Sequence, residues 1–199
     1  MSNNSLTQPS SGNFPLRLLA TNIGCSRYTG EASGTSSYRS GTDSVDESWK
    51  ATGLVYERIL ADDIKVPRFL FNLTAGSVVW SMSGHSNGCA VKAGPATLPV
   101  RADGYNGQLD IRSSIAAVGT WDRRYFAQIF GLPAVEGTAT CANGTFTRWF
   151  APRTSILSTS TGLLYPRSVP PDGILEGTET RTDSPGLTAT WNWRLVPER

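Results

Sequence analysis

The segment GHSNG at residues 84–88 has the G-x-S-x-G spacing of a nucleophile elbow, in which a sharp strand-to-helix turn exposes a catalytic serine. That chemistry needs a general base, and in α/β-hydrolases the histidine follows the serine along the chain. The one histidine here is His85, inside the motif. Gly94 and Pro95 also interrupt the segment where a helix would have to run. We therefore interpret residues 84–88 as a loop between two strands, and we predict a protein that is not an enzyme.

Acidic residues are the next candidates for chemistry. Their clusters are Asp43/Asp46/Glu47, Asp62-Asp63 and Glu176/Glu179. A glycosidase needs two carboxylates that face each other across a cleft, and the sequence alone selects no such pair. Calcium loops use similar clusters, but the pattern D-x-[DN]-x-[DN]-G is absent. We interpret the clusters as solvated turns and expect no metal and no cofactor, with a carbohydrate-active β-sandwich as an alternative.

The chain has three cysteines, which limit the disulfides and metal sites that it can form: Cys25, Cys89 and Cys141. No two of them have the Cys-x-x-Cys spacing, and a single histidine does not complete a zinc site with them. An odd number allows at most one internal bridge. Cys89 follows a strand pattern at 76–83, and Cys141 closes another at 138–141, so a bridge between two sheets there would suit an exported β-domain. The alternative is three buried thiols in a cytosolic protein.

Aromatic residues divide into two groups. The first group lies on the apolar face of alternating patterns and is expected in the core: Trp49, Trp80, Trp191 and Trp193. The second group flanks turns and arginines, and is the candidate contact for a protein partner or a sugar ring: Trp121, Arg124, Tyr125 and Trp149. Exposed aromatic side chains beside charged ones are common in binding surfaces, because one ring offers both an apolar face and a polar tip.

Composition favours strands over helices. Charged residues make up 17% of the 199 residues, whereas Ser, Thr and Gly number 22, 21 and 20. These three residue types weaken helices and suit strands and turns. The net charge is +2 and the basic residues are scattered, so we expect no nucleic-acid partner. No apolar run approaches about 20 residues, so we expect no membrane span.

Alternation of apolar and polar residues predicts the strands. The predicted strands lie at 14–23, 49–59, 69–73, 78–82, 108–112, 125–130, 138–141, 145–150 and 187–195, with a turn at Ala75-Gly76. Asn106-Gly107 and Asn143-Gly144 predict hairpin turns. Residues 26–48 are predicted as a long loop or as an edge hairpin with a polar outer face. About eight or nine strands without helical segments between them predict one antiparallel β-sandwich, immunoglobulin-like or jelly-roll, over residues 14–199, preceded by a flexible tail at 1–13.

The order of several segments resembles small exported β-domains of bacteria that have no known chemistry. These segments are Trp49-x-Ala-x-Gly-x-Val, an apolar strand reaching Cys89, GQLDI, Tyr125, TATC with its turn, and the terminal WNWRL. The resemblance covers about residues 49–195 and is one of layout. It implies a Cys89–Cys141 bridge and a β-sandwich. Residues 1–15, MSNNSLTQPSSGNFP, lack the positive region and the apolar stretch of a secretory signal, which departs from that pattern.

These observations favour a non-enzymatic binding or structural β-sandwich exposed outside the cell, at its surface or secreted. The first alternative is a subunit of a phage or viral particle (a decoration, tail or capsid component) that assembles with copies of itself. The polar tail would then reach a neighbour by strand addition. The second alternative is a carbohydrate-binding or carbohydrate-active β-sandwich. A protein partner or self-assembly is expected, with carbohydrate as a further candidate ligand.

Overall fold

The computed structural model describes residues 25–59, 68–103, 106–117, 120–153, 167–183 and 186–198. In these residues the chain forms strands and no helix, and every strand pairing is antiparallel, which confirms the all-β prediction. The strands are β1 (Arg27–Ser40), β2 (Asp43–Ile59), β3 (Arg68–Ser86), β4 (Cys89–Pro99), β5 (Gly107–Ala117), β6 (Thr120–Ile129), β7 (Val135–Cys141), β8 (Gly144–Phe150), β9 (Arg167–Ser168), β10 (Leu175–Asp183) and β11 (Leu187–Glu198). The predicted tail at 1–13 and strand at 14–23 lie outside the described residues.

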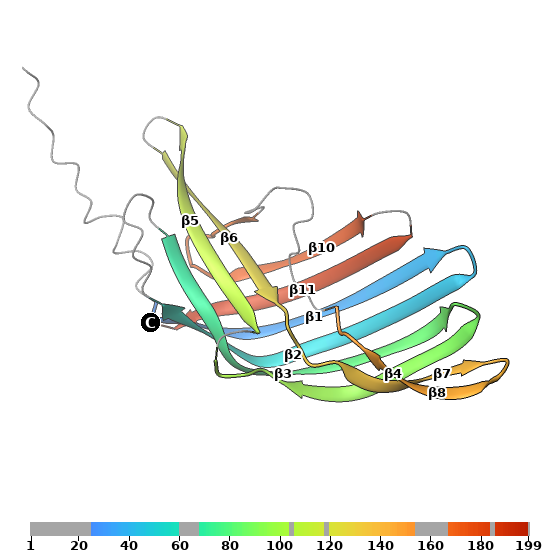
Figure 1. The fold of residues 1–199 in the computed structure, drawn as a ribbon. Helices are drawn as coiled ribbons and strands as arrows, with labels where there is room; N and C mark the ends of the chain where they lie inside the picture. Colours follow the sequence, from blue (N-terminus) through green and yellow to red (C-terminus); the bar gives the residue numbers. More distant parts are fainter. Residues whose placement is uncertain are drawn as a thin grey trace, which may run out of the picture.

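All described strands belong to one hydrogen-bonded network rather than to two separately paired sheets. The main path runs β10-β11-β1-β2-β3-β4-β7-β8, and β5, β6 and β9 branch from it (Figure 1). The branch point is β3. Residues 68–72 of β3 pair with β5, while residues 77–86 pair with β4. The predicted turn at Ala75-Gly76 is instead a bend inside one long strand, with Gly76 at a φ of 143°.

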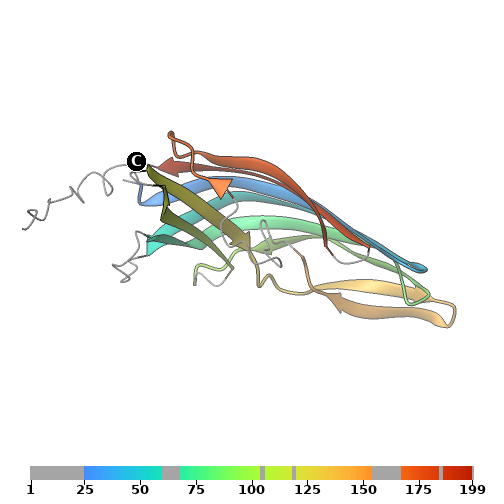
Figure 2. The ribbon, with the colours of Figure 1, turned by 90° about the horizontal axis from the view of Figure 1, so that it is seen from above.

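Strands β5 and β6 lie against one face of the main sheet at one end (Figures 1 and 2). Two hydrogen bonds fix this arrangement. Trp193 Nε1 on β11 donates to the Tyr125 hydroxyl on β6 at 2.9 Å. The Tyr56 hydroxyl on β2 donates to the Gln128 carbonyl on β6 at 3.2 Å. Part of the core of the described residues therefore lies between this end of the sheet and the β5–β6 hairpin. The same buried cluster continues to Val91 on β4 and Ala139 on β7, and β7 and β8 extend at the opposite end of the sheet (Figure 2).

Alternation along each strand directs the large aromatic side chains into this core. The four tryptophans expected there are all buried: Trp49, Trp80, Trp191 and Trp193. Gly34 lies between two of them, opposite Trp191 on β11 and Trp49 on β2. A Cβ atom at Gly34 would come within 2.6 Å of the Trp49 indole nitrogen. Because Gly34 has no side chain, the Trp49 ring can pack over the backbone of β1.

Two hairpin predictions have different outcomes. The hairpin around Asn143-Gly144 is confirmed, with its turn at residues 142–143 and Gly144 as the first residue of β8. The prediction of a hairpin at Asn106-Gly107 is wrong, because β5 pairs with β3 and β6 rather than with β4. Asn106 is buried, accepts a hydrogen bond from Arg101 N, and donates to the carbonyls of Phe130 and Gly131. Its side chain thus ties the start of β5 to the end of β6.

Residues 26–48, predicted as a loop or an edge hairpin, form β1, its turn and the first part of β2. The polar outer face is present, but the position at an edge is wrong. β1 lies in the middle of the main sheet because the C-terminal strand β11 returns to pair with it from Arg27↔Glu198 to Tyr38↔Leu187. The sequence shows no signal for this long-range pairing beyond the apolar alternation of β11 itself.

Glu47 is a carboxylate at the buried face of β2. It accepts a hydrogen bond from Trp80 Nε1 at 3.3 Å and another from Arg153 N at 3.3 Å. Burial raises the pKa of this carboxyl, opposed by these two hydrogen bonds. Because Arg153 lies after the end of β8, Glu47 also ties the segment that follows this strand to β2.

We expect Glu47→Ala to lower the free energy of unfolding by about 1–3 kcal/mol, because the Trp80 indole N–H then loses its acceptor in the core. Glu47→Gln keeps an acceptor oxygen and removes the charge. Above the usual glutamate pKa of about 4.3 and below the raised value, the folded state binds more protons than the unfolded state. Stability contributed by this group therefore falls as the pH rises through that window.

Urea denaturation from pH 4 to 7 measures both effects. The Glu47→Gln variant should show a flatter dependence of the unfolding free energy on pH than the parent protein. An unchanged denaturation midpoint in Glu47→Ala would contradict the role assigned to the Trp80–Glu47 hydrogen bond.

Candidate functional site at the free edge of β8

Strand β8 is the last strand of the main path and pairs only with β7 among the described strands. Its residues are exposed from Gly144 to Trp149, and Phe150 is half-buried. The Trp149 side chain is 67% exposed and that of Phe146 is 44% exposed. Because side chains alternate along a strand, these two rings stand on opposite faces of the sheet. The end of the sheet is therefore apolar on both sides.

The backbone of β8 offers hydrogen bonds along its free edge. The two-residue turn at 142–143 makes Cys141 and Gly144 a hydrogen-bonded pair. Alternation from that pair directs the N–H and C=O groups of residues 144, 146, 148 and 150 toward β7. The same groups of Thr145, Thr147 and Trp149 point away from the sheet. An added strand would therefore find three residues with both backbone groups available.

The two ends of the main path differ in how they present an edge. β10 carries Glu176, Glu179 and Arg181, and its threonine side chains bond back to β11. Charged residues of this kind discourage pairing between sheets. β8, GTFTRWF, contains one charge, Arg148, and no proline. β8 is thus the end of the path with fewer features that prevent strand addition.

A disulfide joins Cys89, the first residue of β4, to Cys141, the last residue of β7. The bridge predicted from the resemblance is therefore present, but it links neighbouring strands of one sheet rather than two sheets. Beside it, β7 pairs with β4 only over residues 137–140. The bridge strengthens this short contact, which holds the β7–β8 hairpin to the sheet. Cys25 is buried and free.

The predicted contact group is not brought together as one site in the described structure. Tyr125 is buried at 1% exposure and accepts the Trp193 hydrogen bond, so its expected role as a surface contact is wrong. Arg124 is exposed on β6, in the branch that pairs with β5 and β9. Trp149 lies on β8, which ends the main path and is not part of that branch. The side chain of Trp121 is not among those that the structure describes. Of the predicted contact group, Trp149 is therefore the residue that lies on the exposed edge of β8.

Phe146 is a member of the exposed edge that the sequence analysis missed. The signal for it was present in residues 145–150, TFTRWF, which have aromatic residues at both even and odd positions. In a strand with one face in a core and the other in water, the residues at either the even or the odd positions would be polar. Aromatic residues on both sets fit a strand that is buried on both faces or that has an unpaired apolar edge.

The motif at residues 84–88 lies where one strand turns into the next, but the loop predicted for it is only two residues long. β3 continues to Ser86, Asn87 and Gly88 form the turn with φ of 52° and 74°, and β4 follows at once. His85 and Ser86 are adjacent residues of one strand, so their side chains point to opposite faces of the sheet. That geometry does not place the imidazole beside the serine hydroxyl.

The acidic clusters have protein partners where the structure describes them. Asp43 accepts a hydrogen bond from Asn87 N, and Arg39 binds both carboxylate oxygens of Asp46. Hydrogen bonding from Arg39 lowers the pKa of Asp46. Glu176 pairs with Arg194, and Glu179 with Arg181. In the described ranges no three His, Cys, Asp or Glu side chains gather as a metal-binding group, and Asp62-Asp63 lie outside those ranges.

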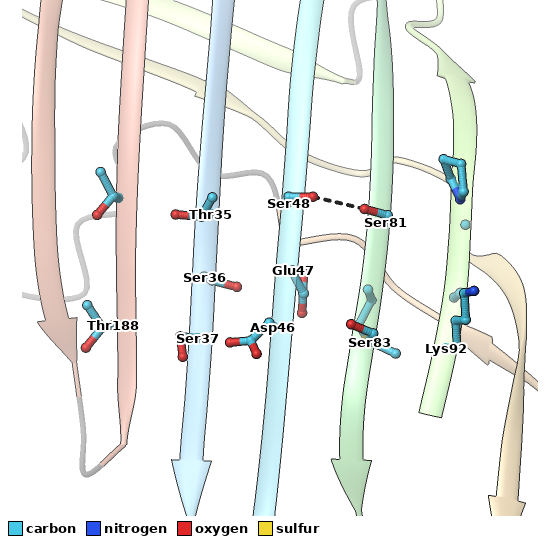
Figure 3. Close-up of a pocket in the computed structure, with 15 residues that line it drawn as sticks. Thr35, Ser36, Ser37, Asp46, Glu47, Ser48, Ser81, Ser83, Lys92 and Thr188 are labelled. Atoms are coloured by element: carbon cyan, nitrogen blue, oxygen red, sulfur yellow. Dashed lines mark hydrogen bonds between the residues drawn. The ribbon is translucent and has the colours of Figure 1, made fainter. Parts of the chain in front are cut away.

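A shallow depression on the outer face of β1, β2, β3, β4 and β11 has Asp46 in its lining (Figure 3). Hydroxyl groups line most of it, and the Ser48 and Ser81 hydroxyls bond to each other at 2.9 Å. The residues described along it include no aromatic ring on which a sugar could stack. The hydroxyls serve cross-strand contacts, which stabilise a sheet. The depression therefore gives little support to a carbohydrate site.

Comparisons of the chain with protein-family models, with curated proteins and with solved structures returned no match. The resemblance to exported bacterial β-domains accordingly stays a prediction. In the part of the chain that the structure describes, no helix has the length and apolar character needed to cross a membrane.

Proposed function

We propose that the chain is a non-enzymatic structural module, exposed outside the cell or on a particle, that works by assembling with copies of itself. The observation that carries this proposal is the free edge of β8, which combines backbone groups that no other described strand pairs with and exposed Phe146 and Trp149 side chains. Large exposed aromatic residues at a sheet edge are typical of protein contact surfaces. The disulfide supports exposure outside the cytosol, because such bridges persist mainly in oxidising compartments.

Sedimentation velocity of the oxidised, full-length protein over a hundredfold range of concentration tests self-assembly. The weight-average sedimentation coefficient should rise with concentration toward that of a dimer or a larger closed assembly. A coefficient that stays at the monomer value over the whole range would contradict the proposed function. The same series with added reductant shows whether assembly needs the bridge that holds the β7–β8 hairpin.

A further inference from the structure

We infer that the partner of β8 is the β8 strand of a second copy, paired antiparallel about a two-fold axis at Thr147, so that two main sheets become one continuous sheet. This inference rests on the proposed function and names the surface and register through which it operates. A two-fold contact uses the same patch on both copies, so β8 must be complementary to itself. Its sequence and its edge geometry allow the register to be derived.

Backbone hydrogen bonding selects the centre of the pair. The outward groups belong to Thr145, Thr147 and Trp149, as the register of the β7–β8 hairpin requires. A two-fold axis at Thr147 places Thr147 opposite its copy, and Thr145 opposite the second copy's Trp149. All three outward residues then exchange hydrogen bonds within the length of β8. An axis at Phe146 or Arg148 leaves one of the three outside the partner strand.

Side chains favour the same register. With the axis at Thr147, each Arg148 lies opposite the second copy's Phe146, where a guanidinium can stack on the ring face. Each Trp149 lies beside the second copy's Thr145, and its ring covers the threonine methyl group. An axis at Arg148 would instead set two like charges directly opposite each other, which destabilises an antiparallel pair. Repulsion between the two arginines therefore favours the register with the axis at Thr147 over the one with the axis at Arg148.

The contact also continues a pattern already present on the outer face. Cross-strand hydroxyl pairs occur there at Thr140–Thr145 on β7 and β8, at 3.1 Å. They also occur at Thr180–Thr190 on β10 and β11, at 2.9 Å. On this face Thr147 lies opposite Thr138 of β7. The two-fold pair would extend that row through both copies of Thr147.

Cysteine cross-linking distinguishes this register from others. In the Thr147→Cys variant the two introduced thiols lie opposite each other, with Cα atoms about 5.5 Å apart, within the range of a disulfide. Mild oxidation should convert most of this variant to a covalent dimer that reductant reverses. Thr145→Cys is the matched control, since it is exposed on the same strand and face. Its two copies would be about 13 Å apart along the strands, too far to join.

A proline variant tests the backbone bonds without relying on cross-linking. Thr147→Pro removes an N–H group that points away from β7, so the β7–β8 hairpin keeps its own hydrogen bonds. We expect an unchanged circular dichroism spectrum and a dimer dissociation constant raised about ten- to hundredfold.

The outcomes separate this inference from the proposed function. Cross-linking at position 147 but not at 145, together with loss of assembly in Thr147→Pro, supports the inference. Assembly of the parent protein that is unchanged in Thr147→Pro, or cross-linking at 145 but not at 147, would overturn the β8 register and leave self-assembly standing. A parent protein that is monomeric at every concentration would overturn both.

Discussion

Replacement of Trp193 by alanine should lower the free energy of unfolding by about 3–5 kcal/mol, as truncation of a large aromatic residue in a core does. Trp193 is 4% exposed and lies across from Gly177 on β10, where a Cβ atom would come within 2.7 Å of its ring. Its indole nitrogen also donates to Tyr125 on β6. The substitution thus opens a cavity where the β5–β6 hairpin contacts the main sheet.

Chemical denaturation monitored by far-UV circular dichroism measures this effect, and two variants serve as controls. Trp193→Phe keeps most of the apolar ring and should lose substantially less stability than Trp193→Ala. Trp149→Ala removes an equally large side chain that is 67% exposed, and at protein concentrations low enough to keep the chain monomeric it should change the unfolding free energy by less than about 0.5 kcal/mol. A loss below about 1 kcal/mol in Trp193→Ala would mean that β11 turns its other face to the core.

Removal of the Cys89–Cys141 bridge should cost about 2–4 kcal/mol of stability. The bridge closes a sequence separation of 52 residues that includes β5 and β6, and it reduces the entropy of the unfolded chain over that length. The Cys89→Ser/Cys141→Ser double variant avoids leaving a single reactive thiol. Urea denaturation of this variant and of the oxidised parent gives the difference directly.

The bridge should also have a local effect, because β7 reaches β4 only through residues 137–140. In the double variant, amides of β8 that bond to β7 should exchange with solvent faster than they do in the oxidised parent. This increase should be larger than any increase for amides in the centre of β2. Cys25→Ser controls for loss of a cysteine elsewhere. Identical denaturation midpoints in the double variant and the oxidised parent would contradict a stabilising role for the bridge.

Strands with one buried face were predictable from the sequence. The alternation from Leu187 to Leu195 identified β11 and its buried face, and it placed Trp191 and Trp193 in the core. This succeeds because a strand half in a core has a strict period of two. The predicted turn at Ala75-Gly76 failed because a glycine that bends a strand and a glycine that ends one give the same signal.

The contacts that depend on long-range pairing were not predictable in the same way. Asn106-Gly107 has the composition of a hairpin turn, yet Asn106 uses its side chain to bind backbone groups at residues 101, 130 and 131. Tyr125 sits beside Arg124 in sequence, but β6 crosses a core that the local pattern does not reveal. Trp149 was predicted as an exposed contact, but Phe146 is recognised as exposed beside it only when β8 is known to end the main path.

Amide hydrogen exchange in β8, measured by NMR at low and high protein concentration, tests the self-assembling edge most directly. The amides of Phe146 and Arg148 bond to β7 and should be protected at both concentrations. The outward amides of Thr145, Thr147 and Trp149 should exchange freely when dilute and become protected when concentrated. Equal exchange rates for these three amides at both concentrations, in a sample that sedimentation shows to be assembled, would contradict pairing through β8.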